Sequence, residues 1–141
     1  MHTLLDGLRS RDETKREPLT AGIQDPSWDF EFGGLRFFVS LFAPFYPATH
    51  SRWSGDASTM FVLLQPERGF RRFGVSSHLH KRKRLSKLIH ARFARHGKHY
   101  DLELNTSSPK ALRYVKPIKT AGAPIRWWEL PVLVDVQRTE R

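Results

Sequence analysis

The residues best suited to chemistry lie together in one short loop. Residues 43–56 contain a single histidine, His50, a single arginine, Arg52, and three aromatic side chains. Pro44 and Pro47 stiffen the loop, because proline fixes its own φ and keeps the preceding residue out of the helical region. A stiff loop can hold an imidazole and a guanidinium in fixed positions. The candidate site is therefore centred on His50 and Arg52, whose spacing alone assigns no reaction.

Two apolar runs flank this loop. Residues 35–42 and 59–66 are rich in aromatic and β-branched side chains, which predicts strands buried on both faces, with Met60 in the core. Ahead of them, Trp28, Phe30 and Phe32 alternate with polar residues and lead into a glycine pair, which predicts a hairpin over 28–42. After them, residues 65–70 read as a turn in which Glu67 is solvated.

The only long amphipathic pattern covers residues 77–96. Ser76 or Ser77 can cap this helix, and Gly97 can end it. Its apolar stripe is Leu85, Leu88, Ile89 and Phe93, and its other face carries Lys81, Arg82, Lys83, Arg84, Lys87, Arg92 and Arg95. Three interpretations of the basic face are open: a solvated surface, a nucleic-acid-binding surface and a membrane-surface helix. Its histidines lack the spacing of a zinc-binding helix.

The remaining pattern favours a small α+β domain. We expect a small mixed or antiparallel sheet with one main amphipathic basic helix packed on it. Residues 1–24 read as a flexible arm, residues 25–136 as the single domain and residues 137–141 as a frayed end. Within the domain, residues 99–105 and 132–136 are expected to be extended, and residues 110–115 to form a helical turn.

Composition excludes several classes of protein. The 141 residues carry a net charge of +10, which would attract nucleic acid, acidic lipid or an anionic ligand. Cysteine is absent, so thiolate chemistry and cysteine ligation are excluded. No apolar run reaches the ~18 residues that a membrane span needs, and we expect a cytoplasmic protein without a membrane partner. The sequence also lacks a serine nucleophile elbow.

A series of landmark residues resembles a known family. In chain order they are Asp25-Pro26, Trp28-Asp29-Phe30, Gly33-Gly34, Phe37-Phe38-Val39, Tyr46-Pro47, Thr49-His50-Ser51-Arg52, Phe61-Val62-Leu63, Gln65-Pro66-Glu67 and Phe70, followed by the basic helix. This order is similar to the C-terminal part of the YqcI/YcgG family of bacterial proteins, over roughly residues 25–117. The loop reads His-Ser-Arg where many members are expected to read His-Pro-Arg. Members are usually longer on the N-terminal side, so we expect either a shortened member or one that completes its site with another chain.

The resemblance implies a chemistry. Some YqcI/YcgG relatives are haem-dependent monooxygenases that hydroxylate a guanidine nitrogen of arginine or an arginine-like small molecule, with a redox partner. By this resemblance His50 would ligate the haem iron, Arg52 would pair with a propionate, and Tyr46 and Trp53, with Phe45, would line the porphyrin. The substrate guanidinium would need a carboxylate, and the candidates are Asp29, Glu31 and Asp56. No catalytic residue is assigned.

Other functions remain open beside the haem enzyme. The cluster of Lys81, Arg82, Lys83 and Arg84 is the candidate surface of a non-catalytic nucleic-acid-binding protein. A truncated family member could instead act as a subunit, in a homo-oligomer or with a partner chain. The structural interpretation of the loop makes His50 a hydrogen-bonded loop residue, Arg52 an ion-pair partner and the aromatic residues part of the core.

Overall fold

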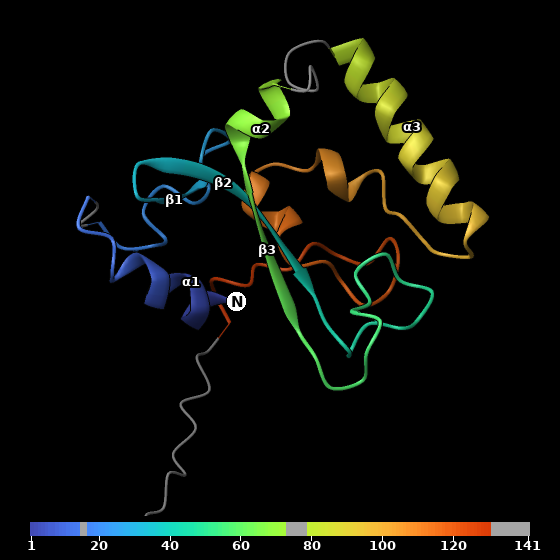
Figure 1. Cartoon of the computed structure of the whole chain (residues 1–141), viewed down its shortest axis with the longest axis horizontal. Helices are drawn as coiled ribbons and strands as arrows, with labels where there is room; N and C mark the ends of the chain where they lie inside the picture. The colour runs from blue at the N-terminus through green and yellow to red at the C-terminus, as the bar shows by residue number, and fades with distance from the viewer. Residues whose placement is uncertain (15–16, 73–78, 131–141) are drawn as a thin grey trace, which may run out of the picture.

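The structure is a computed structural model that describes residues 1–14, 17–72 and 79–130, with positions 71 and 79–83 described by their backbone only. Its helices and strands follow one another as α1 (His2–Arg9), β1 (Phe30–Phe32), β2 (Leu35–Phe42), β3 (Phe61–Pro66), α2 (Glu67–Arg72) and α3 (Leu79–Arg95). Two short 3-10 helices follow, η1 (Leu104–Thr106) and η2 (Lys110–Arg113). The prediction of an α+β fold is confirmed (Figure 1).

The sheet is antiparallel, with the strands in the order β1-β2-β3. The hairpin expected over residues 28–42 is present, and its turn is made by Gly33 and Gly34, whose φ angles are 56° and 73°. Both angles are in the left-handed region, which glycine enters without steric cost. In β2 and β3, Phe42 pairs with Phe61, so the loop that carries His50 joins the far ends of these two strands.

The core covers both faces of the central strand β2, because the successive residues Val39, Ser40 and Leu41 are all buried. Phe30, Val39 and Leu41 share one face of the sheet and are buried, and α1 contacts β1. Leu5, Leu19 and Ile23 belong to the same core cluster and are almost fully buried. Residues 1–24, for which the sequence predicts a lightly packed arm, therefore differ from that prediction, since three of their apolar side chains fill the core.

Strand β3 is not buried on both faces, as its apolar sequence predicted. Met60, Phe61 and Leu63 are 60%, 50% and 44% exposed, so the prediction of a core position for Met60 is also wrong. The reason is topological, because β3 lies at an edge of the sheet. An apolar run does not reveal whether a strand is central or at the edge.

The predicted turn at residues 65–70 is instead the start of α2. Pro66 ends β3, and Glu67 occupies the first helical turn, where a carboxylate interacts favourably with the helix dipole. Glu67 is also not a solvated turn residue, since its carboxylate lies 3.0 Å from Lys110 Nζ. That lysine also binds Asp29, whose side chain is fully buried, so it connects α2, η2 and the entry to β1.

The long basic helix is confirmed over Leu79–Arg95, while its predicted capping residues lie outside the described part. Gly97, with φ 65°, follows its last turn as expected. Phe93 stacks on Tyr100 at 5.0 Å, so the segment after α3 folds back against the helix and lies between it and the sheet in Figure 1.

The segment after α3 only partly matches its predicted structure. Residues 99–105 were predicted to be extended, but they form only a single parallel bridge, between His99 and His50, followed by η1. The helical turn predicted near residue 110 is present as η2. The strand expected at 132–136 and the frayed end at 137–141 lie outside the described residues. In the part of the chain that is described, no helix has the length and apolar character needed to cross a membrane.

Candidate functional site

The loop between β2 and β3 is held closed by its own backbone. Ala43 N–H donates to the Arg52 carbonyl (3.0 Å), and Ser54 N–H donates to the Ala43 carbonyl (3.4 Å). Two further bonds join the loop to the segment after α3, from His99 N–H to the Thr49 carbonyl (2.7 Å) and from Ser51 N–H to the His99 carbonyl (3.1 Å). The stiffness predicted from Pro44 and Pro47 is thus reinforced by these backbone hydrogen bonds.

Tyr46 fixes the loop to a distant part of the chain. Its side chain is 1% exposed, and its hydroxyl donates to the Lys116 carbonyl (2.8 Å) and accepts from Lys116 N–H (3.1 Å). Burial raises the pKa of this phenol, against the effects of the Lys116 hydrogen bond and the nearby Arg52 cation. The hydroxyl therefore satisfies both backbone polar groups of the buried Lys116, its N–H and its carbonyl.

The guanidinium of Arg52 likewise donates hydrogen bonds to backbone carbonyls. It is 7% exposed and donates from Nη1 to the Leu41 carbonyl and from Nη2 to the Arg113 carbonyl, both at 3.3 Å. Its guanidinium carbon lies 5.1 Å from the centre of the Phe42 ring. Burial lowers the pKa of Arg52 to about 10. No carboxylate among the described residues lies within 4.0 Å, so the expected ion pair is replaced by carbonyl hydrogen bonds.

His50 is packed within the same cluster. It is 5% exposed, and its ring stacks on Tyr46 with 4.4 Å between centroids and 5° between planes. Nδ1 accepts the Arg52 N–H at 3.0 Å, and the ring also makes a hydrogen bond to the backbone of Pro117. Proline has no N–H, so the imidazole must be the donor to that carbonyl and carries its proton on Nε2. Burial, with Lys116, Arg52 and His99 nearby, lowers the pKa of His50 to about 4.

These loop residues do not fit the haem site that the resemblance implies. An axial histidine needs a free lone pair on one ring nitrogen, but the Nδ1 lone pair of His50 is used by Arg52 N–H and Nε2 carries the proton. The two guanidinium nitrogens of Arg52 that would bind a propionate already donate hydrogen bonds to backbone carbonyls. Among the described residues, no group of three or more His, Asp or Glu could hold a metal ion either. The packed loop is therefore suited to a structural role.

Trp53 and the three candidate carboxylates are also engaged by the chain itself. Trp53 is half-buried beneath Lys98, whose Nζ lies 4.9 Å from its ring and donates to the Ala48 carbonyl. Asp29 is paired with Arg36 at 2.7 Å and with Lys110, and Glu31 lies 3.7 Å from Arg36. Asp56 accepts hydrogen bonds from Ser58 and Thr59 within its own turn. None of the three is held ready for a guanidinium substrate.

Lys116 is a buried residue that the sequence analysis missed. It is 2% exposed, its Nζ lies 4.7 Å from the centre of the Tyr100 ring, and no carboxylate in the described chain lies within ion-pair distance. Burial and the nearby Arg52 lower its pKa to about 8, while Asp101 acts in the opposite direction. No local pattern could have identified Lys116, because its partners are more than a dozen residues away in sequence.

We expect Tyr46→Phe to lower the free energy of unfolding by about 1–3 kcal/mol. The variant keeps the stacking on His50 but leaves the buried N–H and carbonyl of Lys116 without their side-chain partner. Urea unfolding measures the change, with Phe61→Leu as the control because Phe61 is 50% exposed. Equal stabilities of Tyr46→Phe and the wild type would contradict this role.

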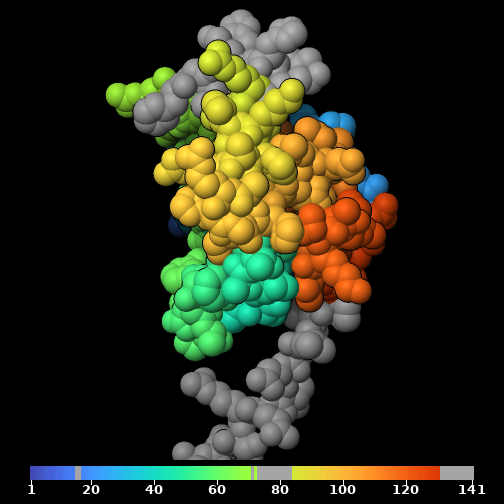
Figure 2. All heavy atoms as spheres, turned by 90° about the vertical axis from the view of Figure 1, so that its right-hand side faces the viewer, coloured from blue at the N-terminus to red at the C-terminus, as the bar shows by residue number. Residues whose placement is uncertain are grey.

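The second candidate surface is the outward face of α3. Arg84, Lys87, Arg92 and Arg95 are exposed along it, and the segment Leu79–Arg95 contains no aspartate or glutamate. Figure 2 shows the helix spread across the face turned to the viewer. Of the cluster singled out in the sequence, Arg84 is exposed, whereas the side chains of Lys81, Arg82 and Lys83 lie outside the described part. The structure thus places at least four cations along one helix.

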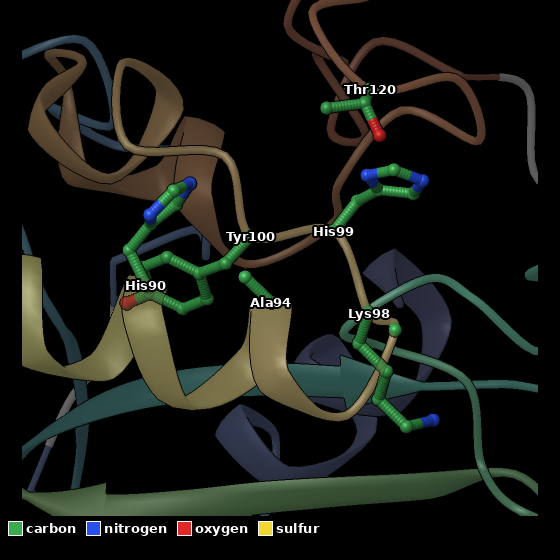
Figure 3. A pocket seen from close by; sticks show the side chains of 7 residues that line it. His90, Ala94, Lys98, His99, Tyr100 and Thr120 are labelled. Atoms are coloured by element: carbon green, nitrogen blue, oxygen red, sulfur yellow. The ribbon is translucent and has the colours of Figure 1, made fainter.

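A pocket of about 280 Å³ lies at the C-terminal end of α3 (Figure 3). Ala94 and Gly97 line it from the helix end, and the polar side chains around it are His90, Lys98, His99, Tyr100 and Thr120. Lys98 points away from the others in Figure 3, consistent with its bond to the Ala48 carbonyl. The exposed Lys87 of the basic face lies three residues before His90, so the pocket adjoins the side of α3 that carries this lysine.

The chain belongs to the YqcI/YcgG family, because the model of that family matches residues 1–106. The match confirms the resemblance and begins at residue 1, so it includes the segment for which the sequence predicts an arm. Neither the curated proteins nor the solved structures contain a significant match to this chain.

Proposed function

We propose that this YqcI/YcgG-family chain binds nucleic acid through the outward face of α3. The observation that supports the proposal is the set of exposed cations Arg84, Lys87, Arg92 and Arg95 on a helix without acidic residues. Within the described residues none of the four has an ion-pair partner. A phosphate backbone would supply the missing negative charge.

The spacing of these cations makes them repel one another when no ligand is bound. Arg84 and Lys87, and likewise Arg92 and Arg95, are three residues apart and are neighbours on the helix surface. Like-charge neighbours of this kind cost roughly 0.2–0.5 kcal/mol per pair, in a chain whose net charge is already +10. Binding to phosphates relieves this repulsion and releases condensed counterions.

We expect Arg92→Gln/Arg95→Gln to weaken binding to a fluorescent oligonucleotide by about tenfold to a hundredfold at ~0.05 M salt, as the loss of two phosphate contacts implies. Fluorescence anisotropy measures the affinity. The matched control is Arg9→Gln/Arg11→Gln, which removes the same charge from the α1 region on another side of the molecule (Figure 1). If the two double variants lose equal affinity, the binding reflects net charge, and the assignment of binding to the α3 surface is wrong.

Haem-dependent N-hydroxylation of an arginine-like small molecule remains a separate proposal that rests on the family resemblance. When bound, haem would supply the iron and oxygen chemistry of such a reaction. Because His50, Arg52 and Tyr46 are committed to the chain itself, we derive no step through them. A visible absorption spectrum of protein purified with haem supplied tests this proposal, and a Soret band lost in His50→Ala but retained in His96→Ala would support it.

A further inference from the structure

We infer that the pocket at the C-terminal end of α3 receives one unpaired base of a nucleic-acid strand whose phosphates lie along the helix. This inference rests on the proposed function and adds a preference for single strands over duplex. The pocket is lined by His90, His99, Tyr100 and Thr120, in addition to Ala94, Gly97 and Lys98. The chemistry of the first four side chains, the size of the pocket and its position beside Lys87 favour such a ligand.

The polar groups around the pocket are available for a ligand. Among the described residues, no side chain or backbone group hydrogen-bonds the imidazoles of His90 and His99 or the hydroxyls of Tyr100 and Thr120. His90 and His99 are exposed. In Figure 3 the His99 ring lies towards Thr120, while the hydroxyl end of Tyr100 lies towards His90. Two imidazoles and two hydroxyls offer both donors and acceptors, as the edge of a nucleobase requires.

Stacking on the base must come from the histidines. The ring of Tyr100 already stacks on Phe93 at 5.0 Å, and Lys116 Nζ lies 4.7 Å from the ring centre. Tyr100 therefore offers its hydroxyl and its edge, whereas the exposed rings of His90 and His99 have no such neighbours among the ring contacts of the described chain. Histidine is one of the side chains on which proteins stack unpaired bases.

The size of the pocket favours a single small planar group. Its volume of about 280 Å³ is below the roughly 300–1,000 Å³ typical of sites for drug-sized molecules. A base within a duplex is stacked and paired, so it cannot enter such a pocket without the cost of unpairing and unstacking. An unpaired base avoids the cost of breaking base pairs, and single strands are therefore the preferred ligand.

The position of the pocket continues the basic face. His90 and Ala94 line the pocket from α3, and the exposed Lys87, three residues before His90 and seven before Ala94, lies on the same side of the helix. A strand that contacts Lys87 through a phosphate would bring a neighbouring base to the pocket. The backbone contacts then provide affinity, and the pocket provides discrimination between paired and unpaired bases.

The experiment compares a single-stranded oligonucleotide, as DNA and as RNA, with duplexes of the same sequences. The wild type is expected to bind the DNA or the RNA strand more tightly than its duplex, by roughly fivefold to a hundredfold, which is the range of one base stacked on a side chain. His90→Ala/Thr120→Ala should abolish this preference. His96→Ala/Thr3→Ala, which changes the same residue types outside the pocket, should retain it.

Each negative result identifies what has failed. Equal binding of single strand and duplex by the wild type, or a preference that survives in the pocket variant, overturns the inference and leaves the α3 surface intact. Absence of binding to all the oligonucleotides at low salt overturns the proposed function itself. Thermal unfolding tests whether the pocket variant folds. We expect it to fold, because His90 is exposed and the Thr120 hydroxyl makes no hydrogen bond within the described chain.

Discussion

Replacing Tyr114 by alanine is expected to lower the free energy of unfolding by about 3–5 kcal/mol, the range for loss of a large buried aromatic side chain. Tyr114 is fully buried and packs against Trp28, Phe38 and Trp127, with ring centroids 5.5–6.0 Å apart. Its removal would open a cavity beside the sheet. The effect is expected to be among the largest of any single substitution in the described part of the chain.

The hydroxyl of Tyr114 contributes separately to this effect. It accepts from Phe30 N–H (3.2 Å) and donates to the Phe37 carbonyl (3.1 Å), joining β1 and β2 where their pairing ends. Tyr114→Phe should therefore cost about 1–3 kcal/mol on its own. Urea unfolding of both variants measures the two parts, with the exposed Phe45→Ala as the control. A stability of Tyr114→Ala within about 0.5 kcal/mol of the wild type would contradict this description of the core.

The second large effect is a loss of stability in acid that depends on His50. Its pKa is about 4 in the folded chain against an ordinary value of 6.5, because charging the buried ring is unfavourable. Between these two values the unfolded chain binds a proton that the folded chain does not, so stability falls as pH decreases from 6.5 to 4. The full difference corresponds to about 3 kcal/mol.

His50→Asn isolates this contribution, because asparagine does not titrate and its amide oxygen can replace Nδ1 as the acceptor for Arg52 N–H. Urea unfolding at a series of pH values measures both proteins. The wild type should lose about 3 kcal/mol more than the variant between pH 6.5 and 4. Parallel profiles would show that the imidazole is charged in the folded chain and so is not buried as described.

The sequence predicted the elements that depend on local pattern. The bounds of β2 follow from its nearly continuous apolar run, and the hairpin turn follows from Gly33 and Gly34. The described extent of α3 follows from its 3.6-residue period. The exposure of Phe61 and Leu63 could not be predicted in this way, because it depends on β3 being an edge strand. The packing of Leu5 and Leu19 into the core was also missed, because it depends on contacts with residues far along the chain.

The roles of the loop residues were the hardest to predict. The sequence places Tyr46, His50 and Arg52 in one stiff loop, but their partners Lys116, Pro117 and Arg113 lie at least 60 residues further along the chain. Histidine and arginine in a stiff loop look the same in sequence whether they bind a ligand or backbone carbonyls. Three-dimensional contacts were needed to distinguish these roles.

If the face of α3 binds the phosphate backbone, the affinity for an oligonucleotide must fall as the salt concentration rises. Each phosphate contact to a single strand adds about 0.7 to the slope of log affinity against log salt concentration. We expect a steep slope for the wild type and a slope smaller by about 1.4 for Arg92→Gln/Arg95→Gln. Affinity that does not change with salt, or an equal slope in the two proteins, would contradict the claim.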